Sequence, residues 1–275
     1  MRSNEIESVE ISLLLDAIFL RYGYDFRGYA KASIRRRIIQ FMQTSGATSI
    51  SEMIPRMIHD ESYFQKMAME FSITVTEMFR DPTLFLSLRQ NVLPVLKSYP
   101  FIKIWHAGCA TGEEAYSLAI LLQEEALDKR TTLFATDFNA DALKKAREGI
   151  LEMDQARLYT QNYQLSGGKG SFSDYYHAHY GALAIKQSLK EKITFANHNL
   201  VTDQVFSETH LILCRNVMIY FNKQLQERVL HLFYDSLVHG GFLCLGMKES
   251  LLFSKYQDCF KVIDQKNKIF QKTDR

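Results

Sequence analysis

The sequence is poor in the residues that break regular structure or cross-link a chain. Its 275 residues include only 13 glycines, four prolines and four cysteines. So little glycine and proline excludes a collagen-like or low-complexity architecture. The 33 basic residues nearly balance the 31 acidic ones, and the net charge is only +2. No overall charge therefore draws the chain to nucleic acid or to a membrane, and a partner recognised by charge must meet a local patch.

Paired cysteines and long apolar runs are also missing. No cysteine belongs to a Cys-x-x-Cys pair or to a zinc-ligand spacing, so we expect no metal site and four free thiols in a reducing compartment. The longest apolar runs, such as residues 118–122, are far too short to cross a bilayer. Residues 1–10 lack the apolar segment of a signal peptide. A cytoplasmic location is the simplest expectation.

The apolar residues, 47% of the chain, are ample for a core, and their spacing predicts two domains. Up to about residue 90 the pattern is helical. Ile11, Leu14 and Ile18 fall at intervals of three and four and form one apolar stripe. Further helices are predicted at about residues 30–44, 51–58 and 84–97. We therefore predict a small all-helical domain over residues 1–90.

From residue 91 onward strands alternate with helices, which predicts a second domain, residues 91–275, built as a doubly wound α/β sheet. The predicted strands are residues 102–106, 132–137, 193–197, 210–214, 242–247 and 268–272. The predicted helices are residues 113–125, 139–150 with Asn139 as N-cap, and 223–239 ended by Gly240-Gly241. A segment at about residues 166–190, rich in glycine, tyrosine and histidine, does not fit the alternation and is interpreted as an insertion.

The loop after the first of these strands, residues 107–114, is the first candidate site. A glycine such as Gly108 lets a ligand approach the backbone closely. The loop is neither a Gly-x-Gly-x-x-Gly nor a P-loop, and Glu113 and Glu114 occupy the helix end where such loops bind phosphate. Carboxylates there repel pyrophosphate but suit a positively charged nucleoside such as S-adenosylmethionine. The alternative is that both glutamates cap the helix and face water.

The second strand ends at an acid, Asp137, 24 residues after Glu113. A carboxylate at this position can accept hydrogen bonds from both hydroxyls of a ribose. An isolated aspartate after a strand is otherwise a turn or cap residue. Together, the glycine loop, the glutamates and Asp137 indicate a nucleoside site at the carboxyl ends of the strands.

Three segments carry a family resemblance: residues 72–81 (Ser-Ile-Thr-Val-Thr-Glu-Met-Phe-Arg-Asp), 110–117 (Ala-Thr-Gly-Glu-Glu-Ala-Tyr-Ser) and 214–221 (Cys-Arg-Asn-Val-Met-Ile-Tyr-Phe). In this order they resemble the chemotaxis receptor methyltransferases of the CheR type, over nearly the whole chain. The resemblance implies a Rossmann-like class I methyltransferase domain, a helical N-terminal domain and a small inserted β-subdomain. It also implies methyl transfer from S-adenosylmethionine, with S-adenosylhomocysteine as product, to glutamate side chains of transmembrane chemoreceptors.

The resemblance also places the cofactor contacts residue by residue. Thr74, Thr76 and Arg80 match the segment that closes over the cofactor, and Glu113 matches the loop acid at its methionine end. The remaining matches are Asp137 at the ribose, Asn199 and Leu200 near the adenine, and Arg215 and Asn216 beside the transfer site. The family often has asparagine where Thr74 stands, which keeps open a cofactor- or nucleotide-binding signalling module of the same fold. A methyltransferase acting on another protein is a further alternative.

Methyl transfer to a glutamate needs no general base, because the carboxylate is already ionised near neutral pH. The enzyme's work is alignment of that carboxylate and exclusion of water. Arg80 is the candidate for orienting it, since its planar fork matches the group, although Arg80 can equally hold the cofactor's carboxylate or pair with Asp81. Tyr220 is a candidate hydrogen-bond donor near the transfer site, or else a core aromatic.

Two surfaces are candidates for docking the receptor. Six basic residues and one acid lie between residues 21 and 37, and Arg35, Arg36 and Arg37 are the predicted contacts with acidic receptor helices. A solvated basic face is the alternative, and nucleic acid is disfavoured because the aromatics do not alternate with the basic residues. The insertion either binds a receptor C-terminal peptide by edge-strand addition or is a structural flap. We expect a monomer with no segment inserted in the membrane.

Overall fold

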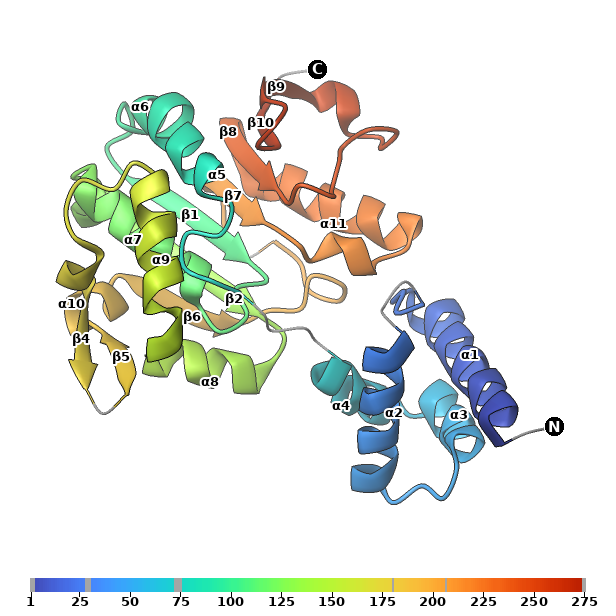
Figure 1. The fold of residues 1–275 in the computed structure, drawn as a ribbon. Coiled ribbons are helices and arrows are strands. Elements are labelled where there is room, and N and C mark those ends of the chain that lie inside the picture. The colour runs from blue at the N-terminus through green and yellow to red at the C-terminus, as the bar shows by residue number, and fades with distance from the viewer. Residues whose placement is uncertain (1–2, 28–30, 72–75, 180, 206, 274–275) are drawn as a thin grey trace. The chain divides into compact units, whose positions relative to one another are not determined.

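The computed structural model describes residues 3–27, 31–71, 76–179, 181–205 and 207–273. The chain divides into two compact units (Figure 1). The helical unit comprises Met1–Ile73 and Met218–Arg228, and the sheet unit comprises Thr74–Val217 and Val229–Arg275. This division lies before the predicted boundary at residue 90, because buried residues between positions 84 and 96 belong to the core of the sheet unit.

The helical unit is built from α1 (Ser3–Tyr22), α2 (Lys31–Ser45), α3 (Ile50–His59) and α4 (Glu61–Phe71). Leu14 and Ile18, from the predicted apolar stripe of α1, are completely buried. The segment Met218–Arg228 is anchored in this unit, since the Asp25 amide donates to the Tyr220 carbonyl at 2.7 Å. The prediction of an all-helical N-terminal domain is confirmed.

In the part of the chain that the structure describes, the sheet unit is organised around one seven-stranded sheet in the order β6-β2-β1-β7-β8-β10-β9. The first five of these strands run parallel, and β10 and β9 add to one edge in antiparallel pairing. The strands are β1 (Ile102–Ala107), β2 (Thr131–Asp137), β6 (Ile193–Asn197), β7 (Thr209–Cys214), β8 (Leu237–Leu245), β9 (Phe260–Asp264) and β10 (Ile269–Lys272). β9 is missing from the sequence-based prediction.

Helices connect the parallel strands and give the predicted doubly wound pattern. α7 (Glu113–Glu124) lies between β1 and β2 in the chain, and α8 (Ala140–Glu148) follows β2. Ile104 and Trp105 at the centre of β1 are completely buried, as expected for a parallel strand covered on both faces. The core of the sheet unit therefore surrounds the strand that leads into the glycine loop.

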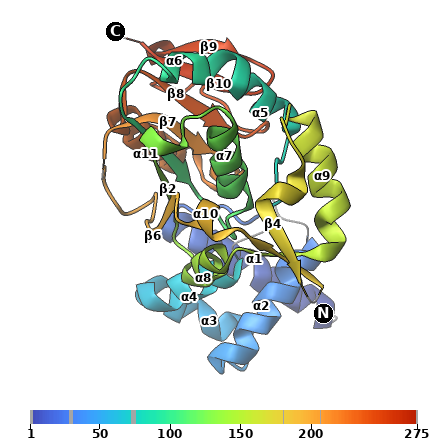
Figure 2. The ribbon, with the colours of Figure 1, turned by 90° about the vertical axis from the view of Figure 1, so that its left-hand side faces the viewer.

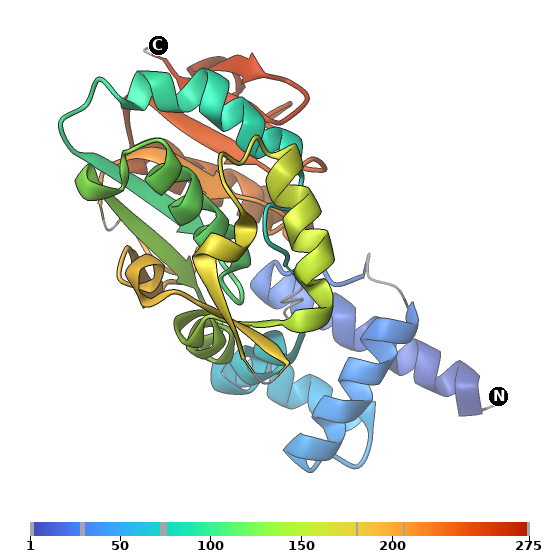
Figure 3. The ribbon, with the colours of Figure 1, turned by 60° about the vertical axis from the view of Figure 1, so that its left-hand side comes forward.

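The insertion forms a small sheet beside α7 (Figures 2 and 3). Its described strands are antiparallel in the order β3-β5-β4, with bounds Ile150–Glu152 for β3, Tyr176–His179 for β4 and Ala182–Ile185 for β5. α9 (Ala156–Leu165) and α10 (Gln187–Lys190) accompany them. The predicted β-subdomain is confirmed, but it begins at Ile150 and not near residue 166. The reason is that α8 ends at Glu148, and Gly149 takes a left-handed φ of 59° before β3.

The end of α11 (Lys223–Ser236) differs from the prediction of a helix to residue 239. Gly240 and Gly241 do not cap this helix, because they lie inside β8. Gly240 has φ 72°, and a Cβ on Gly241 would lie 2.9 Å from the Val238 carbonyl. The register of β8 against β7 also shifts at this point. The glycine pair therefore marks a β-bulge that the sequence pattern does not distinguish from a helix end.

Three smaller predictions concern cysteines and helices. The four cysteines, Cys109, Cys214, Cys244 and Cys259, are free thiols as predicted, and all four are buried. The helix predicted over residues 84–97 consists of α5 (Pro82–Ser87), a π-helical turn (Leu88–Val92) and α6 (Leu93–Leu96). Among the helices described, none is both long and apolar enough to cross a membrane.

Candidate functional site

The carboxyl ends of β6, β2, β1 and β7 lie at one edge of the parallel sheet, where ligands of open α/β sheets bind. The predicted residues of the sheet unit follow these strands: Gly108 and Glu113 after β1, Asp137 at the end of β2, Asn199 after β6, and Arg215 and Asn216 after β7. Parallel pairing thus brings to one edge side chains that lie far apart in the sequence.

The glycine loop is fastened to the end of β2. The Gly108 amide donates to the Thr136 carbonyl at 2.8 Å, and the Ala110 amide donates to Asp137 Oδ2 at 2.9 Å. Gly108 has φ 79°, and a Cβ on it would lie 2.4 Å from Val217 Cγ2. Only glycine fits this position, because a side chain would push the loop away from the segment after β7.

Asp137 is held at the end of β2 by backbone amides. Its Oδ1 accepts from Asn139 at 2.9 Å, while its Oδ2 accepts from Ala110. Asn139 caps α8 as predicted, with its side-chain oxygen accepting from the amides of Asp141 and Ala142. Burial raises the pKa of Asp137, and the two amides lower it only in part. No residue in the described ranges forms an ion pair with Asp137.

Glu113, the first residue of α7, has a similar environment. Thr111 Oγ1 donates to Glu113 Oε2 at 2.7 Å. Burial raises the pKa of Glu113, and the carboxylate of Glu152 raises it further. As far as the structure describes the chain, no cationic side chain pairs with Glu113. We call Glu113 and Asp137 the unpaired acids, since they can accept a cation or hydrogen-bond donors from a ligand.

Glu114, the next residue, has the opposite environment. It is buried, its Oε2 accepts from Arg215 Nη1 at 2.6 Å, and its Oε1 lies 3.0 Å from His106 Nε2. Burial alone would raise its pKa, but the Arg215 charge and the His106 hydrogen bond lower that pKa to about 2. Arg215 also pairs with Asp81. We call His106, Glu114 and Arg215, together with the partly exposed Asp81 at their edge, the buried ion network. Glu114 therefore does not face water, as the helix-capping alternative required.

Arg215 and Asn216, predicted beside the transfer site, differ in how their side chains are used. The Arg215 guanidinium is buried in the ion network, and its Nη1 also donates to the Arg80 carbonyl at 3.4 Å. Asn216 adopts φ 60°, and its Oδ1 is buried without a hydrogen-bond partner among the described residues. A buried acceptor without a donor is uncommon, so Asn216 Oδ1 is available to a ligand donor.

Glu249 is a residue of this region that the sequence analysis does not identify. Its carboxylate accepts three backbone hydrogen bonds, from Asn216 at 3.1 Å, Val217 at 2.9 Å and Gly246 at 2.6 Å. These bonds join the loop after β7 to the loop after β8 and hold Asn216 in its left-handed conformation. No sequence motif marks Glu249, because two of its three partners lie in a different loop.

Arg80 and Thr76 lie on the segment before α5, and Thr74 falls outside the described residues. Arg80 is partly buried, and its charge contributes to the low pKa of Glu114. The structure therefore places Arg80 near the buried ion network. Contacts of these three residues with the cofactor stay predictions.

The backbone around Arg80 has an unusual conformation. Phe79 and Asp81 adopt left-handed φ angles of 52° and 54°. Bulky residues seldom take this conformation, so the surrounding contacts must hold it. The Phe79 amide donates to Ser117 Oγ at 2.7 Å, and Asp81 pairs with Arg215. These contacts fix the residues on both sides of Arg80.

The predicted adenine residues lie in a turn after β6. Asn199 Oδ1 accepts from the Val201 amide at 3.0 Å, and Leu200 is buried. The His198 amide donates to the Asp137 carbonyl at 3.2 Å, since β6 pairs with β2. The structure therefore brings the predicted adenine pair beside the predicted ribose acid, and the contacts themselves stay predictions.

The other predicted residues belong to the helical unit. Tyr220 ends a 3-10 turn within Met218–Arg228, whereas Arg80 belongs to the sheet unit, so their joint action stays a prediction. Arg35 and Arg37 already have partners: Arg35 pairs with Glu7, and Arg37 Nη1 donates to the Glu70 carbonyl at 2.5 Å. Arg36 is exposed, and no acid in the described chain pairs with it.

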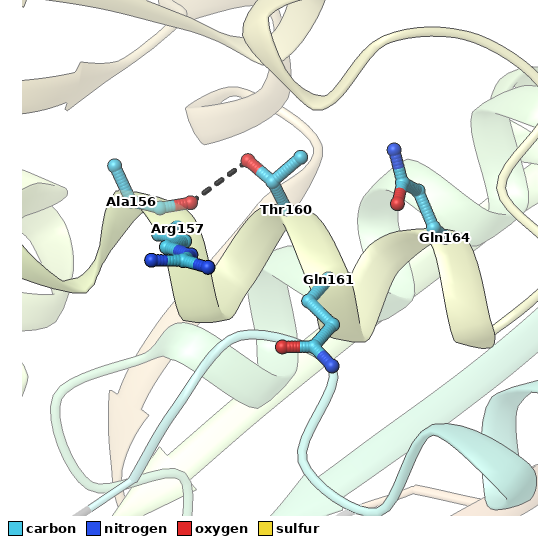
Figure 4. A pocket seen from close by; sticks show the side chains of 5 residues that line it. All are labelled: Ala156, Arg157, Thr160, Gln161 and Gln164. Atoms are coloured by element: carbon cyan, nitrogen blue, oxygen red, sulfur yellow. Dashed lines mark hydrogen bonds between the residues drawn. The ribbon is translucent and has the colours of Figure 1, made fainter.

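A hollow on the surface of the inserted subdomain does not belong to this site. Its lining residues all come from α9 and are Ala156, Arg157, Thr160, Gln161 and Gln164 (Figure 4). Thr160 Oγ1 donates to the Ala156 carbonyl at 2.8 Å, an ordinary bond within a helix. None of the predicted residues lines the hollow. In the described ranges, no group of three or more histidine, cysteine or acidic side chains could hold a metal ion.

Two protein-family models match the chain. The model described as CheR methyltransferase, SAM binding domain, matches residues 74–269. The model described as CheR methyltransferase, all-alpha domain, matches residues 10–72. The two matches meet where the helical unit ends and the sheet unit begins.

Individual proteins are also similar across both units. The chain is 49% identical to methyltransferase Cher3 of Pseudomonas putida, over 99% of this chain and 100% of that protein. It is 29% identical to a chemotaxis protein methyltransferase of Listeria innocua, over 84% of this chain and 86% of that relative. It is 31% identical to an uncharacterized 104.1 kDa protein of Rhodobacter capsulatus over 94% of this chain, but it spans only 27% of that much longer protein.

Proposed function

Since the chain belongs to the CheR methyltransferase family, we propose that it methylates glutamate side chains of chemoreceptors, forming γ-glutamyl methyl esters in the cytoplasm. Membership establishes a methyltransferase whose sheet unit binds S-adenosylmethionine. The proposed part is the acceptor. Support for it comes from relatives in Listeria innocua and Salmonella typhimurium, which are named chemotaxis protein methyltransferases.

The observation that carries the proposal is the pair of unpaired acids beside the glycine loop. Glu113 and Asp137 lack a cation in the described chain, and Asn216 Oδ1 is a buried acceptor without a donor. These residues fit S-adenosylmethionine, because it brings positive charge and hydroxyl donors to a set of acceptors. Glu113 would hold its charged methionine end and Asp137 its ribose. When bound, the cofactor supplies a methyl group on a positively charged sulfur.

The chain's own task is to orient the acceptor carboxylate and to exclude water. No proton has to be removed, because a glutamate side chain is ionised near neutral pH. Arg80 is proposed to orient this carboxylate through its planar guanidinium. Arg215 supports that role, since it donates to the Arg80 carbonyl and pairs with Asp81, the next residue. Tyr220 is proposed to donate a hydrogen bond to the same carboxylate.

We propose that α2 docks an acidic receptor helix. The Arg35 charge is compensated by Glu7, and the Arg37 guanidinium donates to a backbone carbonyl. The exposed basic side chains that keep their charge available are therefore Lys31 and Arg36. Two such charges can steer an acidic partner without binding it tightly.

The inserted β-subdomain is proposed as a second receptor contact. β4 stands at the end of the strand order β3-β5-β4 and pairs only with β5 among the described strands. Its free edge offers backbone amides and carbonyls to an added strand, which an extended peptide can supply. A receptor C-terminal peptide is the proposed occupant of this edge.

The proposal is tested by transfer of a radiolabelled methyl group from S-adenosylmethionine to a cytoplasmic chemoreceptor fragment. We expect label on the receptor that is released by mild base, because a carboxyl methyl ester hydrolyses readily whereas an N-methyl group does not. The matched control is Asp137→Ala, which should label the receptor far more slowly. Cofactor binding without any receptor labelling would contradict the proposed acceptor and favour either another protein substrate or a signalling module without catalysis.

A further inference from the structure

The loop between β8 and β9 presents large apolar side chains to solvent. Phe253 is 79% exposed, Leu252 is 58% exposed and Met247 is 44% exposed. Single exposed apolar residues are ordinary on a protein surface, but these three lie in one short loop, and we call them the apolar patch. We call residues 246–256 the β8–β9 loop.

Two side chains, one in this loop and one just after it, accept hydrogen bonds from its backbone. The Phe253 amide donates to Gln257 Oε1 at 2.9 Å, and the Leu252 amide donates to Ser250 Oγ at 3.0 Å. Leu251, the residue before them, is buried and anchors the loop. Phe253 nevertheless adopts φ 63°, an unfavourable conformation for a bulky side chain. An exposed aromatic held under such strain indicates a function in contact with a partner.

The β8–β9 loop starts at the same edge of the sheet as the candidate site. β8 runs parallel to β7, and Leu245 pairs with Cys214, so Gly246 follows β8 where Arg215 follows β7. Glu249, inside the loop, accepts hydrogen bonds from the amides of Asn216 and Gly246. The apolar patch is therefore tied to the loop that carries Asn216.

The charges of the loop favour an acidic partner. Its single acid, Glu249, is buried and is occupied by backbone amides. Lys248 beside it is exposed. The outward face of the loop thus combines apolar side chains with positive charge, which complements a helix that has an apolar stripe and acidic flanks.

We propose that Met247, Leu252 and Phe253, with Lys248, form the docking surface for the methyl-accepting helix at the sheet unit. The inference rests on the proposed function, since that function supplies a glutamate-bearing partner. The acceptor has to reach the carboxyl ends of the strands, and this patch borders that edge. Apolar contact then positions the helix, while Lys248 favours acidic helices over others.

The test compares two phenylalanines of equal exposure. Phe253→Gly removes the apolar side chain and also relieves the left-handed strain, so the variant should fold at least as stably as the parent. Phe101→Gly is the matched control, because Phe101 is 78% exposed but precedes β1, at the opposite edge of the sheet. Binding of a cytoplasmic chemoreceptor fragment and of S-adenosylhomocysteine, and KM for the fragment in methyl transfer, are measured on the full chain.

We expect Phe253→Gly to weaken fragment binding and raise the fragment KM by about tenfold, the usual loss at an interface anchor. Affinity for S-adenosylhomocysteine should not change, and Phe101→Gly should change neither quantity. Lys248→Glu should weaken fragment binding as well, and the loss should shrink at high salt. The same fragment affinity and the same fragment KM for Phe253→Gly and Phe101→Gly would overturn the inference.

The proposed function and this inference fail in different ways. A parent chain that binds the fragment but never methylates it contradicts the proposed function, and the binding comparison then still decides the docking surface. A parent chain that methylates the fragment while Phe253→Gly does so equally well contradicts the docking surface alone. No binding of the fragment by the parent chain contradicts both.

Discussion

Glu113 and Glu114 are consecutive residues at the start of α7, yet their surroundings have opposite effects on the two carboxyl groups. Burial raises the pKa of Glu113, and no described cation compensates its charge. Glu114 is more deeply buried, but Arg215 and His106 lower its pKa to about 2. The charge of Glu114 is thus compensated within the protein, whereas that of Glu113 has no described counter-charge and is proposed to meet the cofactor.

The same division holds for the acids around them. Asp81 belongs to the buried ion network with Arg215, while Asp137 has only backbone amides and stays without a described cation. Carboxyl groups with shifted pKa values are frequent at functional sites, but buried ion pairs shift pKa values too. Whether a cation is already paired with the carboxylate therefore separates a structural acid from a candidate binding acid. The predictions that follow separate the stability expected from the ion network from the cofactor binding that we propose for the unpaired acids.

The largest expected effect is on stability and comes from breaking the ion network. Arg215→Met leaves the charge of Glu114 buried without its partner, which typically costs about 3–5 kcal/mol of unfolding free energy. Urea unfolding of the cofactor-free chain measures the loss. Arg36→Met, at an exposed and unpaired arginine, is the control and should cost almost nothing. Equal stability of the two variants would mean that the network does not hold the fold.

The next effect is on cofactor affinity. Asp137→Ala removes the proposed acceptor for the ribose hydroxyls and should weaken S-adenosylmethionine binding by about 1–3 kcal/mol, the usual result of leaving a buried polar group unpaired. Isothermal titration calorimetry measures it. Asp141→Ala, in the first turn of α8, is the matched control and should bind as the parent does. An unchanged affinity for Asp137→Ala would refute the ribose role.

A smaller effect is expected in the pH dependence of unfolding. The folded pKa of Glu114 lies below its ordinary value of 4.5, at about 2, so its contribution to stability is complete above the ordinary value. That contribution should fade as the pH falls from about 4.5 towards 2, because protonation removes the pairing with Arg215. Comparing urea unfolding of the parent and Glu114→Gln over this range checks it. Parallel pH profiles for the two chains would contradict the assignment.

The smallest expected effect is on the KM for the receptor, and it compares an arginine of α2 that has an acidic partner with one that has none among the described residues. Arg36→Glu should raise the KM for a chemoreceptor fragment by a few-fold, since an exposed charge contributes only about 0.2–1 kcal/mol. Cofactor affinity should stay the same. Arg35→Gln, which removes a charge already paired with Glu7, should have less effect on the receptor. If Arg36→Glu leaves the KM unchanged, α2 is not the docking face.

The sequence was sufficient for the parts of the fold that depend on local pattern. Alternating strands and helices predict the parallel sheet, and Asn139 is recognisable as a cap because its partners are the next residues. The end of α11 and the start of β3 differ from the prediction because Gly240 and Gly149 serve a bulge and a cap that local composition does not separate. β9 was missed because its pairing with β10 is a tertiary contact.

In the candidate site, too, features set by local sequence can be predicted and tertiary contacts cannot. The glycine loop, Glu113 and Asp137 can be placed at the carboxyl ends of the strands from sequence, because each directly follows or ends a strand, while their roles stay proposals. The partners of Arg215 cannot be predicted from sequence, because Arg215 contacts Glu114 and Asp81 only once β7 has paired with β1. Glu249 has no sequence signal for the same reason, because its partners Asn216 and Val217 lie in another loop.

The proposed role of Glu113 is tested by calorimetric titration of S-adenosylmethionine into the parent chain and into Glu113→Gln, from acidic to neutral pH. A raised pKa means that Glu113 must lose its proton before it can bind a cation, so the parent's affinity should rise with pH and then level off. Glu113→Gln should bind about tenfold more weakly at neutral pH, with a flatter profile, because a charged hydrogen bond is lost. Its unfolding free energy should not fall. The same affinity and the same pH profile for both chains would contradict the claim that Glu113 is left unpaired for the cofactor.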